Sequence, residues 1–202
     1  MNLIYDINHN LKQDCFVKEP IIVEVLEIDE ENYKKFRKDS SLAHNTGQNI
    51  IPIVIDSFGG DAYALLGMVD VIKNSKIPVA TIVEGKAMSC GSILLSCGHK
   101  GMRYISPHST LLIHDVSSDN NGGKLEEIKI DAQETERIND LVYQILEKNC
   151  EKSKNYFKNI ISKNGHMDWY MDAKTAIKYN IADNIFIPNF KIKIGMDFTL
   201  EQ

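Results

Sequence analysis

Short apolar runs alternate with stretches of helical periodicity along most of this chain, and this alternation limits the possible folds more than any other feature. The apolar runs lie at residues 21–28, 50–56, 77–83 and 109–116 and are rich in Ile, Val and Leu. Such runs are typical of strands that are buried on both faces of a parallel sheet. Strands and helices in alternation require right-handed crossovers on that sheet. The sequence therefore predicts an α/β fold with a parallel sheet.

Helices are predicted between and after these strands. The first covers residues 29–40, with Asp29 as its N-cap, and the polar segment "SLAHNTGQN" after it is expected to be a loop. Another follows "SFGGD", and a short apolar helix is expected at residues 89–98. The C-terminal part predicts a helix near 153–163, a turn at "GHMDW", a helix at "AKTAIKY" that ends at Asn180, and a strand near "NIFIP".

The longest helix is predicted from Lys124 to about Asn149. One face of it carries an apolar stripe with the 3.6-residue period. The stripe consists of Leu125, Ile128, Ala132, Ile138, Leu141, Val142, Ile145 and Leu146. A helix of this length in a small domain is expected to project and to pack on another surface.

The chain length of 202 residues suits one domain. We expect an N-terminal segment at 1–20, the folded domain at 21–188 and a polar C-terminal tail at 189–202. The apolar runs are far shorter than the roughly 20 residues that span a bilayer. The N-terminus shows no basic start followed by an apolar block, so no signal peptide is expected. These features predict a cytoplasmic protein that does not bind membranes.

Charge and cysteine content exclude several further classes of function. A net charge of -5 argues against nucleic acid as the main partner. The four cysteines form no CxxC pair, so neither a zinc site nor a disulfide framework is indicated. No G-x-x-x-x-G-K-[ST] sequence occurs, so ATP hydrolysis by this chain is not expected. We predict no cofactor and no metal.

Three strands end in residues that can do chemistry, and ligands of open α/β sheets bind at such strand ends. In "EGKAMSCGS", Ser89 lies between a strand and a short helix. Ser89 is therefore either the N-cap of the helix or a nucleophile whose oxyanion would face free helix N–H groups. His114 is either a simple strand-end residue or a base that accepts the serine proton. Gly59 and Gly60 form either a tight turn or a loop whose N–H faces an oxyanion.

A third acidic residue would be needed to orient His114. Asp115 is expected on the opposite face of its strand from His114. Asp172 has the position of an N-cap for the helix that follows it. Asp168 lies in a turn without such a duty, and it is therefore the preferred candidate.

The stretch from Ser89 to His114 resembles the proteolytic subunit of the Clp protease, in the crotonase-like superfamily. Its matching features are small-x-Ser-x-Gly, a short Leu-rich helix, G-x-K-G-x-R, x-P-x-S and a strand that ends in histidine. "DSFGGDAYALLGMVDVIKNSKIPVATIVEG" is similar to the glycine loop, first helix and next strand of that family. "DWYMDAKTAIKYNIADNI" resembles the segment that carries its acid and its closing helix and strand. The resemblance runs from about residue 50 to residue 185.

This resemblance implies a ClpP-like, crotonase-like α/β fold of repeated β-β-α units with a protruding long handle helix. It implies that Ser89 is the nucleophile, His114 the general base and acid, and Asp168 the group that orients His114. The backbone N–H groups of Gly60 and Cys90 would form the oxyanion hole. The implied activity is that of a serine endopeptidase that hydrolyses unfolded polypeptides without using ATP itself.

The resemblance also implies an assembly. The handle helix would mesh between two stacked heptameric rings, which gives a tetradecamer with its active sites inside. A separate AAA+ unfoldase would feed polypeptide substrates into this homo-oligomer.

Three positions depart from the family pattern. Phe58 replaces a proline before the glycine pair, which leaves the glycines but changes the site for the substrate strand. "HDVSSDNNGG" lacks the proline that usually follows the base and is more acidic. Trp169 replaces an arginine that contributes to contacts between rings, so the coupling of ring stacking to activity is expected to differ.

Other functions stay open at this stage. A viral capsid-maturation protease shares these sequence signals. A signal-peptide-peptidase-like enzyme would use a lysine base, for which Lys86 is the candidate. The non-proteolytic alternatives are a catalytically silent structural subunit and a crotonase-type acyl-CoA enzyme. Cys90 is an alternative nucleophile, although a thiol at the start of a buried helix usually belongs to the core.

Overall fold

The computed structural model of the protein describes residues 20–118 and 122–188. Residues Ile21–Pro188 form one compact unit. The expected N-terminal segment, apart from Pro20, and the expected tail at 189–202 lie outside the described residues. Among the helices that the structure describes, none is both long enough and apolar enough to cross a bilayer.

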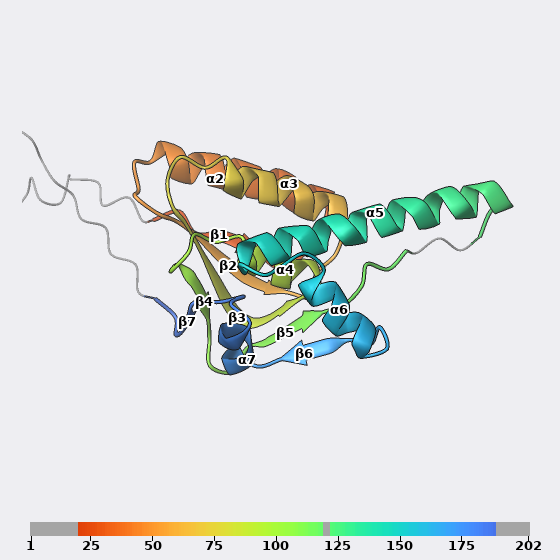
Figure 1. Ribbon diagram of the computed structural model, residues 1–202. Helices are drawn as coiled ribbons and strands as arrows, with labels where there is room; N and C mark the ends of the chain where they lie inside the picture. The colour runs from red at the N-terminus through yellow and green to blue at the C-terminus, as the bar shows by residue number, and fades with distance from the viewer. Residues whose placement is uncertain (1–19, 119–121, 189–202) are drawn as a thin grey trace, which may run out of the picture. The chain divides into compact units, whose positions relative to one another are not determined.

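A parallel sheet forms the centre of this unit, as the alternating pattern predicts (Figure 1). Its main path has the order β1-β2-β3-β4-β7, and β5 pairs with β3 beside that path. These parallel strands are β1 (Val23–Val25), β2 (Ile51–Ser57), β3 (Val79–Met88), β4 (Arg103–Ile105), β5 (Thr110–Ile113) and β7 (Asn184–Ile185).

The strand β6 (Trp169–Met171) corrects the prediction of a purely parallel sheet. It pairs antiparallel with β5, and its first residue, Trp169, lies in the segment where the sequence predicts a turn. Only Met171 of its residues is buried. A strand of this length with one buried residue shows no alternation, so the pattern gives no signal for it.

The strand β3 changes its neighbour halfway along its length. Thr81, Ile82 and Val83 pair with β4, whereas Lys86, Ala87 and Met88 pair with β5. Between these two parts lies Gly85, whose φ of 82° is left-handed and whose added Cβ would lie 3.0 Å from the carboxylate of Asp56. Glycine is therefore needed where the strand changes partner. This change places the ends of β3 and β5 side by side.

Six helices surround the sheet within the described residues (Figure 1). They are α2 (Glu30–Asn45), α3 (Ala62–Lys73), α4 (Cys90–Ser96), α5 (Leu125–Asn149), α6 (Tyr156–Lys163) and α7 (Ala173–Lys178). Asp29 and Asp172 cap α2 and α7, accepting hydrogen bonds from the backbone N–H of Asn32 and of Thr175, as predicted. Asn180 follows α7 with a φ of 65°, the left-handed ending that the sequence indicates.

The helix α2 is longer than predicted. It continues to Asn45, through the first half of the segment that was expected to be a polar loop. Ser40 and Ala43 are buried on the helix face that packs toward the core. Tertiary burial of small residues therefore extends a helix that local polarity would end.

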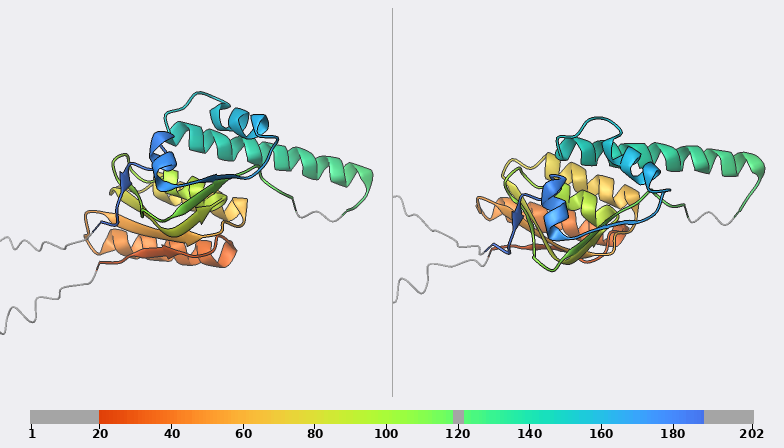
Figure 2. Two further views of the ribbon diagram at one scale, coloured as in Figure 1. Left: turned by 90° about the horizontal axis from the view of Figure 1, so that it is seen from below. Right: turned by 60° about the horizontal axis from the view of Figure 1, so that its bottom comes forward.

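The helix α5 confirms the predicted long helix and divides into two different halves. Its C-terminal half buries Ile138, Val142 and Leu146. Its N-terminal half extends past the sheet (Figures 1 and 2) and exposes Leu125 and Ile130. The predicted apolar stripe is thus buried within this chain along only half of its length.

Arg103, the first residue of β4, joins three elements. Its guanidinium is almost fully buried and bonds to both carboxylate oxygens of Asp183, at 2.5 and 2.9 Å. It also donates to the carbonyl oxygen of Asn149 at 3.0 Å and to Oδ1 of Asn180 at 3.2 Å. Arg103 therefore holds the C-terminal ends of α5 and α7 against the sheet.

Replacing Asp183 by alanine is expected to lower the free energy of unfolding by about 3–5 kcal/mol, because it leaves a buried guanidinium without its partner. Urea denaturation at fixed protein concentration measures this loss. The exposed pair Lys100 and Glu151 supplies the control, since Lys100→Ala is expected to cost at most about 1 kcal/mol. Equal losses in the two variants would contradict the role given to Arg103.

Candidate active site

A single residue, Ser89, turns the chain from β3 into α4. The strand β3 ends at Met88 and the helix α4 begins at Cys90. Ser89 has φ 53° and ψ −121°, a conformation that costs a residue other than glycine about 1–3 kcal/mol. Its side chain makes no capping hydrogen bond to α4, so the side-chain N-cap hypothesis is wrong. The hydroxyl is free to face another group.

The turn at Ser89 is bonded to the end of β5. The backbone N–H of Ser89 donates to the carbonyl oxygen of Leu112 at 2.9 Å. The buried hydroxyl of Ser92 lies 2.6 Å from the carbonyl oxygen of Ala87 and 2.9 Å from that of Leu112. These bonds fix β5, two residues before His114, against the start of α4.

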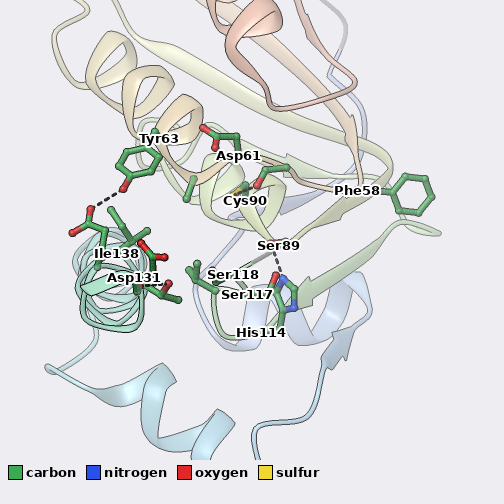
Figure 3. Close-up of a pocket in the computed structure, with 15 residues that line it drawn as sticks. Phe58, Asp61, Tyr63, Ser89, Cys90, His114, Ser117, Ser118, Asp131 and Ile138 are labelled. Carbon is green, nitrogen blue, oxygen red and sulfur yellow. Dashed lines mark hydrogen bonds between the residues drawn. The ribbon is translucent and has the colours of Figure 1, made fainter. Parts of the chain in front are cut away.

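The hydroxyl of Ser89 lies 2.7 Å from Nε2 of His114 (Figure 3). On the other side of the ring, Nδ1 lies 3.5 Å from Oδ1 of Asp168. The register of β5 and β6 explains this second approach. Ile113 pairs with Trp169 in an antiparallel ladder, so the next residue after Ile113 and the residue before Trp169 lie opposite each other. The structure thus brings Ser89, His114 and Asp168 together.

The glycine pair lies beside this turn. An added Cβ on Gly59 would lie 2.8 Å from Cβ of Ser89, and one on Gly60 would lie 2.2 Å from the carbonyl oxygen of Ile28. The backbone N–H of Ile28 donates to the carbonyl oxygen of Gly59, and the carbonyl oxygen of Ile28 accepts from the N–H of Asp61. The N–H of Gly60 takes no part in these two bonds. Close approach, rather than turn geometry alone, requires both glycines.

Cys90 is a poor alternative nucleophile. Its side chain is buried, and its Sγ lies 3.3 Å from the carbonyl oxygen of Gly60. Burial raises the pKa of the Cys90 thiol to about 11, and hydrogen bonding to Ser89 offsets only part of that rise. Because the thiolate is the reactive form, a thiol with this pKa is inert at neutral pH.

Lys86 is bonded elsewhere and does not serve as the serine's base in this structure. Its ammonium lies 2.7 Å from Oδ1 of Asp56 and 4.3 Å from the centre of the Phe58 ring. Phe58 itself is exposed and points away from the pair formed by Ser89 and His114 (Figure 3). The phenylalanine that replaces the family's proline therefore covers Lys86 by a cation–π contact.

A cavity of about 740 Å³ opens in front of Ser89 and His114. Its walls come from the start of α3, the start of α4, the segment after His114 and the middle of α5. Tyr63 on α3 donates to Glu134 on α5 at 2.7 Å across one side (Figure 3). Asp61 and Asp131 add further carboxylates to the lining. The cavity is large enough for several residues of an extended peptide.

A cluster of polar side chains around Asp115 adjoins this site and was not predicted from the sequence. Asp115 bonds to Asn139 and Tyr143 on α5, and its other oxygen lies 2.6 Å from Nδ1 of His166. Asp115 thus bonds both to α5 and to the turn that precedes Asp168. Asn139 and Tyr143 are four residues apart on one helix face, and a polar Asn beside the apolar stripe was the available signal. Nothing in the sequence links His166 to Asp115.

In the part of the chain that the structure describes, no group of three or more His, Cys, Asp or Glu side chains is placed to hold a metal ion.

Comparison with known proteins decides the family. The family model described as Clp protease matches residues 7–189, which is most of the chain. The chain belongs to the Clp protease family. The resemblance seen in the sequence and the fold expected from it are therefore confirmed.

One member of the Clp protease family gives a measure of the similarity. The ATP-dependent Clp protease proteolytic subunit of Deinococcus radiodurans is 31% identical to this chain over 135 residues. The aligned part is 67% of this chain and 64% of that relative, so the chain spans just under two thirds of the relative's length.

Iodoacetamide is expected to leave Cys90, Cys97 and Cys150 unmodified in the folded protein at pH 7.5. All three are buried, and burial raises their pKa values to about 11 or about 12. Peptide mass spectrometry measures the adducts, and the same protein in urea, where every cysteine reacts, is the control. Rapid alkylation of Cys90 in the folded state would restore it as a candidate nucleophile.

Proposed function

We propose that this chain is the peptidase subunit of a Clp-type protease and that residues 21–188 are its serine peptidase domain. In this proposal Ser89, His114 and Asp168 form the catalytic triad. The observation that supports it most strongly is the 2.7 Å contact between the hydroxyl of Ser89 and Nε2 of His114, at a strained turn that leaves the hydroxyl free of capping.

Acylation follows from this geometry. With its proton on Nδ1, facing Asp168, His114 has an unprotonated Nε2 that accepts the hydroxyl proton as Oγ of Ser89 attacks a peptide carbonyl. The imidazolium then gives that proton to the leaving amine, and the C–N bond breaks. Water attacks the acyl-enzyme in the second half, with His114 again as base. No cofactor or metal is required.

The oxyanion of each tetrahedral intermediate needs hydrogen-bond donors. We assign this role to the backbone N–H groups of Gly60 and Cys90. Cys90 is the first residue of α4, where N–H groups have no partner within the helix. The helix terminus also favours negative charge. Both residues line the cavity with Ser89 and His114. Donors fixed in this way act where charge develops and need no rearrangement.

Asp168 would keep the ring of His114 in the productive orientation and stabilise the imidazolium. At 3.5 Å, the distance between Oδ1 and Nδ1 exceeds the range of about 2.7–3.2 Å for an ordinary hydrogen bond. Catalytic hydrogen bonds often tighten only when substrate binds. A small movement of Asp168 toward His114 therefore forms part of the proposal.

The proposed assembly is a pair of stacked heptameric rings. The exposed residues Leu125, Ile128 and Ile130 on the projecting half of α5 support this, because apolar side chains on an unpartnered helix favour burial against another subunit. Active sites would then lie inside a tetradecamer, and unfolded polypeptides would reach them through an AAA+ unfoldase. The proposed location is the cytoplasm, where free thiols persist.

We expect the wild type to hydrolyse a fluorogenic peptide and an unfolded protein. The rate of hydrolysis is expected to fall by 10³-fold or more in Ser89→Ala and in His114→Ala. Size-exclusion chromatography with light scattering on the same samples is expected to give a mass close to fourteen times the 22.9 kDa subunit. His108→Ala, an exposed histidine outside the site, is the matched control for His114→Ala.

Two results would contradict the proposal. Hydrolysis that survives Ser89→Ala would assign the activity to another residue or to a contaminant. An assembled wild-type particle without any peptidase activity, even when an unfoldase is supplied, would indicate a structural subunit.

A further inference from the structure

We propose that His166 and Asp115 form a clamp that holds Asp168 beside His114, which makes His166 a positioning residue for the peptidase reaction. This inference rests on the proposed function. His166 and Asp115 act on the proposed triad by positioning its residues and not by contacting the substrate.

The clamp joins the two segments that carry the acid and the base. Nδ1 of His166 lies 2.6 Å from Oδ2 of Asp115. Asp115 directly follows His114, and His166 precedes Asp168 by two residues. The contact therefore crosses from the end of β5 to the start of β6. It extends the pairing of Ile113 with Trp169 beyond the last ladder position.

Asp168 needs such a support because packing does not fix it. Its side chain is 51% exposed and lies 3.5 Å from His114. The neighbouring Met167 is also exposed. His166 has a φ of 59°, and its backbone N–H donates to the carbonyl oxygen of Ile161, so the segment leaves α6 through a left-handed turn. His166 and Asp168 both reach from this segment to residues just after β5, His166 to Asp115 and Asp168 to His114.

Asp115 is a firm anchor for the clamp. Its Oδ1 accepts hydrogen bonds from Nδ2 of Asn139 at 3.1 Å and from the hydroxyl of Tyr143 at 3.0 Å, both on α5. Oδ1 of Asn139 in turn accepts the N–H of Val116 at 2.9 Å. The carboxylate and the strand end are thus bonded to a long helix whose C-terminal half is packed in the core.

The charges around Asp115 determine which partner donates. Burial raises the pKa of Asp115, but hydrogen bonds from His166, Asn139 and Tyr143 outweigh it, so that pKa lies below its usual value. Asp115 is therefore a carboxylate at neutral pH, and Nδ1–H of His166 is the donor to it. Lys158 on α6 lines the same hollow as Asp115, but its ammonium bonds to Asp140 at 2.5 Å and does not replace His166.

The test compares His166→Ala with His166→Asn in the full-length assembled protein. Nδ2 of asparagine occupies nearly the position of Nδ1 of histidine, and asparagine tolerates a positive φ. We expect His166→Ala to lower kcat for a fluorogenic peptide by about 10- to 100-fold with KM within about twofold, because a misplacement near 1 Å can cost this much. His166→Asn is expected to recover most of kcat, and His108→Ala serves as the control.

A second background separates positioning from a general loss of structure. In Asp168→Ala the clamp has no acid left to position, so adding His166→Ala is expected to change kcat by less than twofold. A further loss of tenfold in that background would overturn the proposal, and so would an unchanged kcat in His166→Ala alone.

Hydrogen exchange measured by mass spectrometry tests the clamp without reference to catalysis. Faster exchange over residues 164–171 is expected in His166→Ala and near wild-type exchange in His166→Asn. Unchanged exchange in His166→Ala would overturn the clamp. Wild-type protein without peptidase activity, together with faster exchange in His166→Ala, would refute the proposed function while leaving the clamp as a structural contact.

Discussion

The geometry of the site depends on the conformation of one residue, because Ser89 alone connects the end of β3 to the start of α4. A left-handed serine is costly, and the surroundings stabilise it through its N–H bond to Leu112 and the buried hydroxyl of Ser92. Gly59 approaches so closely that a Cβ there would contact the serine side chain. The same conformation turns the hydroxyl away from the helix and toward His114. The strained conformation of Ser89 is therefore the one that gives the contact with His114 on which the proposed chemistry depends.

A second constraint acts through the sheet. The short antiparallel pairing of β5 with β6 brings the ends of two segments that are far apart in the sequence to the same place. His114 leaves one strand where Asp168 enters the other. Directly after His114, Asp115 bonds to α5 and to His166. The positions of His114, Asp168 and Asp115 thus depend on three residue pairs of one ladder and on the long helix beside it.

Much of this could be predicted from the sequence where the signal is local. Short-range rules predict the helix caps Asp29 and Asp172, the helix ending at Asn180 and the long helix. The pattern from Ser89 to His114 could be recognised from residue types and their spacing alone. The sequence did not predict the strand β6 or the continuation of α2 through Ala43, because each depends on burial by distant elements. The contact between His166 and Asp115 joins residues 51 positions apart in a turn with no periodic pattern. The contact between Phe58 and Lys86 could not be predicted either, because only the fold shows that the Phe58 ring lies over the Lys86 ammonium.

The proposed function requires that Ser89, and no other side chain, is the activated nucleophile. Covalent capture tests it most directly: the assembled wild-type protein is treated with a fluorophosphonate at neutral pH, and the modified residue is located by tandem mass spectrometry. One adduct is expected, on Ser89, and its formation is expected to be lost in His114→Ala. An adduct on another residue, or labelling of Ser89 at an unchanged rate without His114, would contradict it.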